Sequence, residues 1–187
     1  MGLGNPGSRF DGTRHNVGFA MVEQAAQAVG ARLRRRVFRP YRCAHVPAGP
    51  EASALTLAQP LTYMNRSGDA MRGLLRLSGA SVERTLVICD NVDLEPGRLR
   101  MKRGGGTAGH RGLASVVDAL GSGEFLRLYV GVGRPEDGDV VGHVLGRPET
   151  EERERYEQAF SRGADSVLAL RRRTPEQVMN EVNRPIQ

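Results

Sequence analysis

Apolar residues recur along the chain with two different spacings, which predict helices that alternate with strands. Positions 17–29 carry apolar residues at helical spacing and stop at Gly30. Further helices are expected at 68–77, 112–120, from 150 and from 174, and strands at 42–46, 53–57, 85–89, 98–101 and 126–132. This alternation predicts one α/β domain over residues 1–187, a twisted mixed sheet with helices on both faces.

Residues at the ends of these segments support the predicted helix boundaries. Ser67 is placed to cap the helix of 68–77, and Gly79 follows its end. Thr174–Gln177 has the pattern of a capping box with proline at the first helical position. Gly2–Gly7 resembles the turn after a strand, but no strand precedes it, so the first strand of the sheet is expected to be missing or truncated.

Composition narrows the class of protein. Of the 187 residues, 39% are hydrophobic and 26% are charged, which is enough apolar surface to bury a core. The longest apolar runs hold four or five residues, far too few to span a membrane, and no signal peptide is visible. Two cysteines cannot form a disulfide scaffold, so a reducing compartment is expected.

The net charge of +6 favours a polyanionic partner, with nucleic acid first. The surplus lies in residues 1–148, because residues 149–187 carry seven basic and eight acidic side chains. Arg98, Arg100 and Lys102 are expected on one side of a strand, next to Arg103 and the glycines of 104–106. We favour phosphate binding here, with a solvated edge strand as the alternative.

Two residues suggest acid–base chemistry. His15, just before a predicted helix, could act as a general base near neutral pH, or it could only cap or pack that helix. Asp90 ends a predicted strand, where open α/β sheets bind ligands and where an acid could orient a histidine, although Asp is also common in plain turns.

Two further segments suggest recognition. Asn65 could donate to a carbonyl and accept from an amide at once, and Tyr63 could stack on a base. The alternatives are core packing for Tyr63 and Met64, and a helix cap for Asn65. His110 and Arg111 lead into a predicted helix N-terminus, which favours phosphate.

Gly2–Gly7 also matches the glycine pattern of dinucleotide sites. The preceding strand is absent, and Pro6 lacks the N–H that a phosphate cradle uses, so a tight turn is the simpler interpretation. The sequence contains no phosphate-binding loop with Lys, no H-E-x-x-H, no C-x-x-C and no G-x-S-x-G. A histidine that activates water is therefore the economical hydrolytic option.

Taken together, the segments resemble bacterial peptidyl-tRNA hydrolase. The matching stretches, in the family's order, are Gly2–Gly7, Thr13–Phe19, Pro60–Gly68, Asp90–Leu94, Lys102–Gly106, Gly109–Leu113 and Val130–Pro135. Each motif is weak alone, but the ordered set is highly specific and covers residues 2 to about 148.

This resemblance implies an activity and a site. The family cleaves the ester between a peptide and the terminal ribose of tRNA, in the cytoplasm, as a monomeric α/β domain that needs no metal or cofactor. On this chain His15 would activate water, Asp90 would hold His15, and Asn5 with Asn65 would recognise the peptidyl end. The residues implied in binding substrate and the tRNA acceptor end are Phe10, Tyr63, Met64, Lys102, Arg98, Arg100, Arg103, His110 and Arg111.

The chain departs from the family pattern at four positions. Phe10 replaces a usual Tyr, Arg111 replaces a usual Asn that helps to hold water, Asn91 replaces an acid, and Tyr129 replaces a basic residue. Arg111 cannot accept a hydrogen bond, and it could contact phosphate instead. These departures leave open an alternative from another class, a non-catalytic RNA-binding protein on the same fold.

Overall fold

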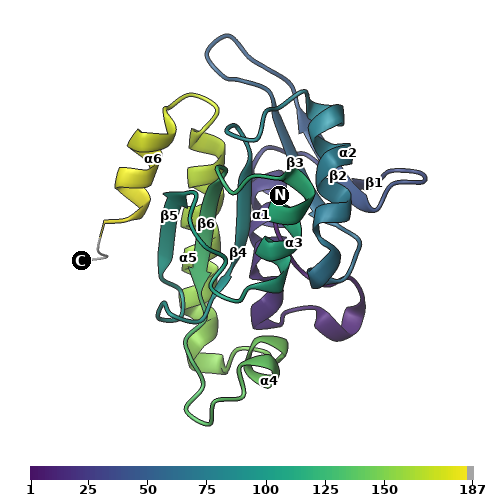
Figure 1. Cartoon of the computed structure of the whole chain (residues 1–187). Coiled ribbons are helices and arrows are strands. Elements are labelled where there is room, and N and C mark those ends of the chain that lie inside the picture. Colours follow the sequence, from purple (N-terminus) through teal and green to yellow (C-terminus); the bar gives the residue numbers. More distant parts are fainter. Residues whose placement is uncertain (185–187) are drawn as a thin grey trace.

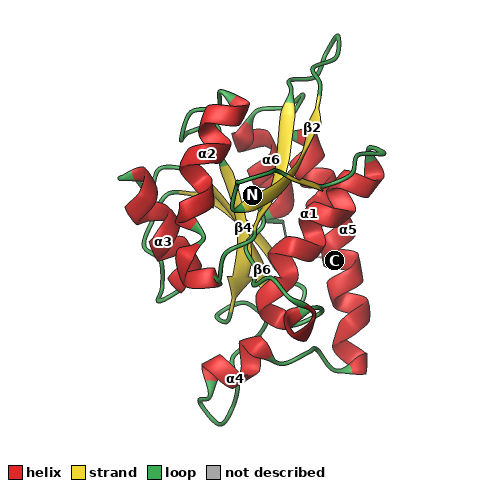
Figure 2. Ribbon diagram, turned by 90° about the vertical axis from the view of Figure 1, so that its right-hand side faces the viewer, coloured by secondary structure: helices red, strands yellow, loops and turns green. Residues whose placement is uncertain are grey.

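The computed structural model describes residues 1–184 as three layers, with strands in the middle and helices on both sides (Figures 1 and 2). Helices α2 (Gly68–Ser78) and α3 (Arg111–Leu120) pack together on one face, and α1 (Val17–Ala28) and α5 (Thr150–Ala169) pack together on the other. Two shorter helices, α4 (Val140–Leu145) and α6 (Pro175–Val182), complete the set, and α6 packs against β5 (Leu99–Arg103). The predicted α/β class is confirmed.

The strands form two three-stranded sheets. The first has the order β1-β2-β3, with β1 (Arg34–Arg35), β2 (Tyr41–Val46) and β3 (Leu55–Pro60) all antiparallel. The second has the order β4-β6-β5, in which β4 (Leu86–Asn91) runs parallel and β5 antiparallel to β6 (Leu126–Gly131). The second sheet is therefore mixed, as the sequence predicted.

Residues 1–3 connect the two sheets. The Gly2 amide donates to the Ala58 carbonyl of β3 at 3.0 Å, and the Leu3 amide donates to the Ile88 carbonyl of β4 at 2.8 Å. The Ile88 amide in turn donates to the Met1 carbonyl at 2.9 Å, and Gly2 forms a parallel bridge with Ile88. Residues 1–3 thus take the central position between β3 and β4.

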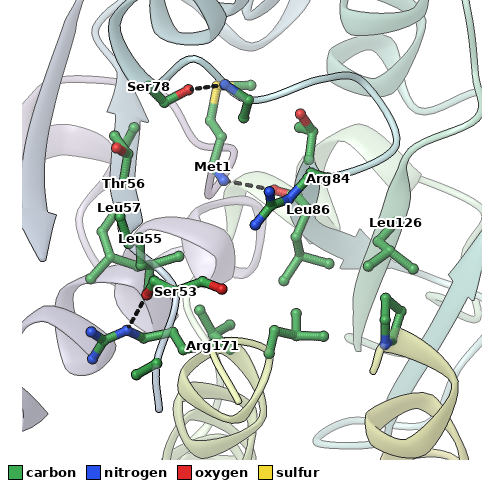
Figure 3. Close-up of a pocket in the computed structure, with 18 of the residues that line it drawn as sticks. Met1, Ser53, Leu55, Thr56, Leu57, Ser78, Arg84, Leu86, Leu126 and Arg171 are labelled. Carbon is green, nitrogen blue, oxygen red and sulfur yellow. Dashed lines mark hydrogen bonds between the residues drawn. The ribbon is translucent and has the colours of Figure 1, made fainter. Parts of the chain in front are cut away.

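A cavity of about 990 Å³ opens beside Met1, between β3 and β4 (Figure 3). Leu55 and Leu57 line one wall, and Leu86 and Leu126 line the other. The α-ammonium of Met1 donates to the Leu86 carbonyl at 2.7 Å, and burial lowers its pKa to about 5. The cavity contains none of the site residues predicted from the sequence.

The core divides into layers according to strand alternation. On β4, Ile88 faces α1 and α5, while Val87 and Cys89 face α3. On β6, Leu128 joins the first group and Tyr129 the second. Both faces of each strand are covered, which is why the segment 85–89 is apolar without alternating.

Several predicted element boundaries need correction. Strand β3 ends at Pro60 rather than near residue 57, because Gln59 is fully buried and its amide donates to the Phe19 carbonyl at 2.8 Å. Ser67 does not cap α2: its backbone is already helical, and its hydroxyl donates to the Met64 carbonyl. The short elements β1 and α4 were not predicted. The capping box at Thr174 and the left-handed Gly79 after α2 are confirmed.

Gly18 allows α1 to approach the centre of the sheet. A Cβ at this position would lie 2.5 Å from the carbonyl oxygens of both Leu3 and Ile88. Gly2 and Gly4 are equally enclosed, by the Gly18 carbonyl and the Phe19 ring. These glycines serve protein packing, and Gly7 has a φ of 108°, both of which support the tight-turn interpretation of Gly2–Gly7.

Replacement of Gly18 by Ala is expected to lower the free energy of unfolding by about 1–3 kcal/mol, because backbone atoms must move to admit the methyl group. Urea denaturation measures this change. Gly49→Ala is the matched control, because its Cβ meets no atom within 4 Å, and it is expected to change stability by less than about 0.5 kcal/mol. Equal effects of the two substitutions would contradict this account of α1 packing.

Candidate active site

Three elements bring titratable side chains to the carboxyl end of β4. Asp90 is the next-to-last residue of β4, and His15 lies in the 3-10 turn Arg14–Asn16 that leads into α1. His110 is the residue that caps the N-terminus of α3. The sequence placed each of these residues at an element end, and the fold brings the three ends together.

Asp90 accepts from both histidines through the same oxygen. His15 Nδ1 lies 2.8 Å from Asp90 Oδ1, and His110 Nε2 lies 3.1 Å from it. The Asp90 side chain is 4% exposed, against 16% for His15 and 9% for His110. His15 is therefore the most accessible member, and its Nε2 is the ring nitrogen that Asp90 does not occupy.

Burial and the two histidines oppose each other at Asp90. Burial by itself would raise the pKa of the carboxyl, but attraction to His110 and its hydrogen bond, together with those of His15, outweigh burial. The pKa of Asp90 is consequently held well below its usual range. The neighbouring Cys89 thiol is affected oppositely, because burial and then the Asp90 charge raise its pKa, so Cys89 is a poor nucleophile.

The residue types of this cluster, two histidines and an aspartate with ligand atoms within 4.8 Å of one another, would also suit a metal ion. His110 Nδ1, however, accepts from the Gly112 and Leu113 amides at 3.1 and 3.2 Å. A neutral imidazole that accepts at Nδ1 carries its proton on Nε2, so ligation there would break both bonds or require an imidazolate. The geometry fits hydrogen bonding better than metal binding.

Asn5 is held rigidly beside the start of α1. Its backbone amide donates to Asn16 Oδ1 at 2.8 Å, and Asn16 Nδ2 donates to the Asn5 carbonyl at 3.0 Å. Asn5 Oδ1 accepts from the Met64 amide at 2.7 Å. These bonds fix which side-chain atom is the oxygen, and they leave Asn5 Nδ2 as the donor available to a ligand. The role of Asn16 was not found from the sequence.

The loop of residues 60–67 contributes differently at each position. Met64 is buried against the start of α3, in space that Gly112 leaves open because it lacks a Cβ. Asn65 is exposed, and Tyr63 is 56% exposed. The rings of Phe10 and Tyr63 meet edge to face at 6.5 Å, and the Arg9 guanidinium lies 4.4 Å from the Phe10 ring centre. An aromatic pair with exposed Tyr63, partly exposed Phe10 and an added cation suits base stacking, and Arg9 was not predicted.

The cations of the predicted basic strand differ in their contacts. Leu99 and Met101 are buried and Arg100 is exposed, which confirms the alternation along β5. Arg98 donates to the carbonyls of Asn183 and Arg184, and Arg103 donates to those of Glu83 and Glu124.

The side chain of Arg100 makes no hydrogen bond within the described residues, and Lys102 Nζ lies 5.5 Å from the centre of the Tyr129 ring. Arg100 and Lys102 are therefore the cations of this strand best placed for a ligand.

A buried arginine shapes the glycine loop next to this strand. Arg127 is fully buried, and it donates to the carbonyls of Gly106 at 2.6 Å and Gly123 at 3.2 Å. Gly104 and Gly105 have φ values of 64° and 96°, which favour glycine strongly. Arg127 therefore holds the glycine loop from inside the protein. The sequence pattern could not show this role, because Arg127 lies within an apolar strand.

Similarity to known proteins agrees with this arrangement. The family model described as peptidyl-tRNA hydrolase matches residues 1–187. The chain belongs to the peptidyl-tRNA hydrolase family.

Individual members of the peptidyl-tRNA hydrolase family align over nearly their whole length. The peptidyl-tRNA hydrolase of Rubrobacter xylanophilus is 43% identical over 184 residues, 98% of each chain. That of Caldanaerobacter subterraneus is 36% identical over 97% of each. A crystal structure of peptidyl-tRNA hydrolase from Acinetobacter baumannii superposes with a TM-score of 0.90 at 36% identity, covering 97% of this chain and 92% of that one.

The departures from the peptidyl-tRNA hydrolase pattern lie around the cluster. Arg111, the first residue of α3, is exposed, and its side chain makes no hydrogen bond within residues 1–184. Asn91 Oδ1 accepts from the Asp93 amide at 2.7 Å, so Asn91 shapes the turn after β4. Tyr129 is buried under Lys102. None of these residues disturbs the bonds of His15 or His110 to Asp90.

The lowered pKa of Asp90 makes stability depend on pH in acid. The unfolded carboxyl binds its proton near pH 3.9, and the folded one only at lower pH. The stabilisation by ionised Asp90 is thus complete well above pH 4 and is lost as the pH falls below about 5. Asp90→Asn is expected to cost about 1–3 kcal/mol near pH 7, and the difference from wild type should shrink towards pH 3. Chemical denaturation across pH 3–7 measures it, and a constant difference would contradict this account.

Proposed function

We propose that this protein hydrolyses the ester bond between a peptide and tRNA, with His15 as the general base. The observation that supports this most directly is the 2.8 Å contact of His15 Nδ1 with buried Asp90. Donation from Nδ1 to the carboxylate leaves the lone pair on Nε2, and it stabilises the imidazolium that forms when Nε2 takes a proton. Family membership supports the same reaction.

The reaction follows from this arrangement. His15 Nε2 takes a proton from water as the water oxygen bonds to the ester carbonyl carbon. The tetrahedral intermediate then collapses, the carbon–oxygen bond to the ribose breaks, and the ribose oxygen takes the proton from His15. The products are a peptide with a free carboxyl group and tRNA with a free terminal hydroxyl. This route uses no metal and no cofactor.

Asn5 and Asn65 are proposed to recognise the peptidyl part. Asn5 Nδ2 is a donor that the protein does not use, and its orientation is fixed by the bonds to Met64 and Asn16. It would donate to a substrate carbonyl near the scissile bond, where a preoriented donor is worth most. Exposed Asn65 would pair with the neighbouring peptide group.

The tRNA would lie across the surface on both sides of this cluster. Phe10 and Tyr63 would stack with the terminal bases, and Arg111, at the positive end of α3, would meet a phosphate. Lys102 and Arg100 would contact phosphates further along the acceptor end, with Arg98 and Arg103 adding positive charge behind them. We expect the protein to act as a monomer in the cytoplasm.

A non-catalytic RNA-binding protein on this fold is not favoured. Such a protein would have no need of the His15–Asp90 pair, yet the pair is complete, and the relatives reported above are named as hydrolases. The structure contains no helix, within its described part, that could cross a membrane.

Replacement of His15 by Asn is expected to lower the turnover of N-acetyl-aminoacyl-tRNA by about 100- to 10,000-fold, because the general base is lost. Release of the labelled N-acetyl-amino acid measures this rate. His45→Asn is the matched control, since His45 is exposed on β2, and its activity should remain within twofold of wild type. Full activity of the His15 variant would show that the base is assigned wrongly.

Replacement of Lys102 by Ala is expected to weaken tRNA binding and to reduce the slope of log K against log salt by about 1, since one phosphate contact is lost. Titration of deacylated tRNA at several salt concentrations gives the slope. Arg162→Ala, an exposed position of α5 on the opposite layer, should leave the slope unchanged. Identical slopes for wild type and the Lys102 variant would mean that Lys102 is only solvated.

A further inference from the structure

His110 has two simultaneous hydrogen-bonding tasks. Its Nδ1 accepts from the Gly112 and Leu113 amides at the first turn of α3, and its Nε2 lies 3.1 Å from Asp90 Oδ1. A proton on Nδ1 would point at two other protons, so the cap fixes the ring in the form protonated at Nε2. The cap thereby determines what His110 offers to Asp90.

We infer that His110 is a positioning residue that, through its cap of α3, presents a permanent Nε2–H donor to Asp90 and so leaves His15 as the only base. This inference rests on the proposed function of His15. Two consequences follow from the shared oxygen. The carboxylate is kept ionised by a donor that does not leave during the reaction, and its position is fixed from the α3 side while His15 approaches from the α1 side.

The arrangement also disfavours a positive charge on the His110 ring. The two imidazole rings lie 5.3 Å apart between centres, so two cations here would repel each other strongly. A second proton on His110 would break both cap bonds and place a cation at the positive end of α3. The proton taken from water therefore stays on His15, where the ribose oxygen can retrieve it.

The charged and titratable groups around the pair come from several elements. Cys89 and Asp90 belong to β4, Arg111 follows His110 on α3, and Tyr156 belongs to α5. Burial, and then Glu152, raise the pKa of Tyr156 to about 12, and burial raises that of Cys89. Both side chains therefore stay neutral near pH 7, where the reaction runs.

Ring ¹⁵N NMR of the wild-type protein between pH 5.5 and 8 tests the proton position directly. We expect the His110 signals to report a proton on Nε2 and an unprotonated Nδ1, as the cap bonds require. A His110 ring protonated on Nδ1 anywhere in this range would overturn the inference. This readout does not depend on activity, so it remains decisive even if the proposed hydrolysis proves wrong.

Two substitutions separate the cap from the donor. His110→Asn keeps an oxygen that can cap α3 but is too short to reach Asp90, so we expect nearly wild-type thermal stability with activity lowered about ten- to a hundredfold. His110→Gln is a poor cap but can extend an N–H towards Asp90. We expect it to lower the Tm by about 2–4 °C and to retain more activity than the Asn variant.

His110→Ala removes both functions and should show both losses. A purely structural role for His110 would make activity follow thermal stability, with the Asn variant the most active of the three, and that order would overturn the inference. Absence of turnover in the wild-type protein would instead contradict the proposed function, while the NMR result would still decide the proton position.

Discussion

The close approach of residues 1–4 to β4 and α1 is the constraint on which the rest of the structure depends. The Leu3 amide bonds to the Ile88 carbonyl, two residues before Asp90, and Gly18 lets α1 lie against both. This contact joins the two sheets at their centre. It also directs Asn5 and His15, which follow in the chain, to the carboxyl end of β4, where open α/β sheets bind their ligands. Backbone packing thus sets the positions of Asn5 and His15, and hydrogen bonds then set the orientation of their side chains.

Asp90 then organises the site electrostatically. A buried carboxylate is costly unless donors compensate for its lost hydration, and here two histidines from different elements supply them. The same two bonds leave a different nitrogen free on each imidazole ring. His15 retains an accessible Nε2, whereas His110 spends its other nitrogen on the cap of α3. One carboxylate thereby connects the cap of α3 with the orientation of both rings, and with the proton transfer that we propose for His15.

The positive surface depends on an internal cation as much as on exposed ones. Arg127 is fully buried and uses its guanidinium to hold the carbonyls of Gly106 and Gly123. The glycine loop above it keeps its positive φ values, while Lys102 and Arg100 remain beside it on β5. Arg98 and Arg103, in contrast, are bound to backbone carbonyls. The cations at the two ends of this segment therefore hold backbone carbonyls, and the two in its middle are the ones that we propose to contact phosphate.

The sequence by itself determined the α/β class, most helices, and the identity of the candidate residues, because apolar periodicity, caps and the ordered motifs are local properties. It missed the end of β3 because Gln59 is polar yet buried by specific hydrogen bonds. Only the tertiary structure decided that His110 bonds to Asp90, that Asn16 holds Asn5, and that Arg127 lies inside. Each of these is a contact between residues 11 to 21 positions apart or a matter of burial, and no local pattern encodes which distant partner a polar side chain will meet.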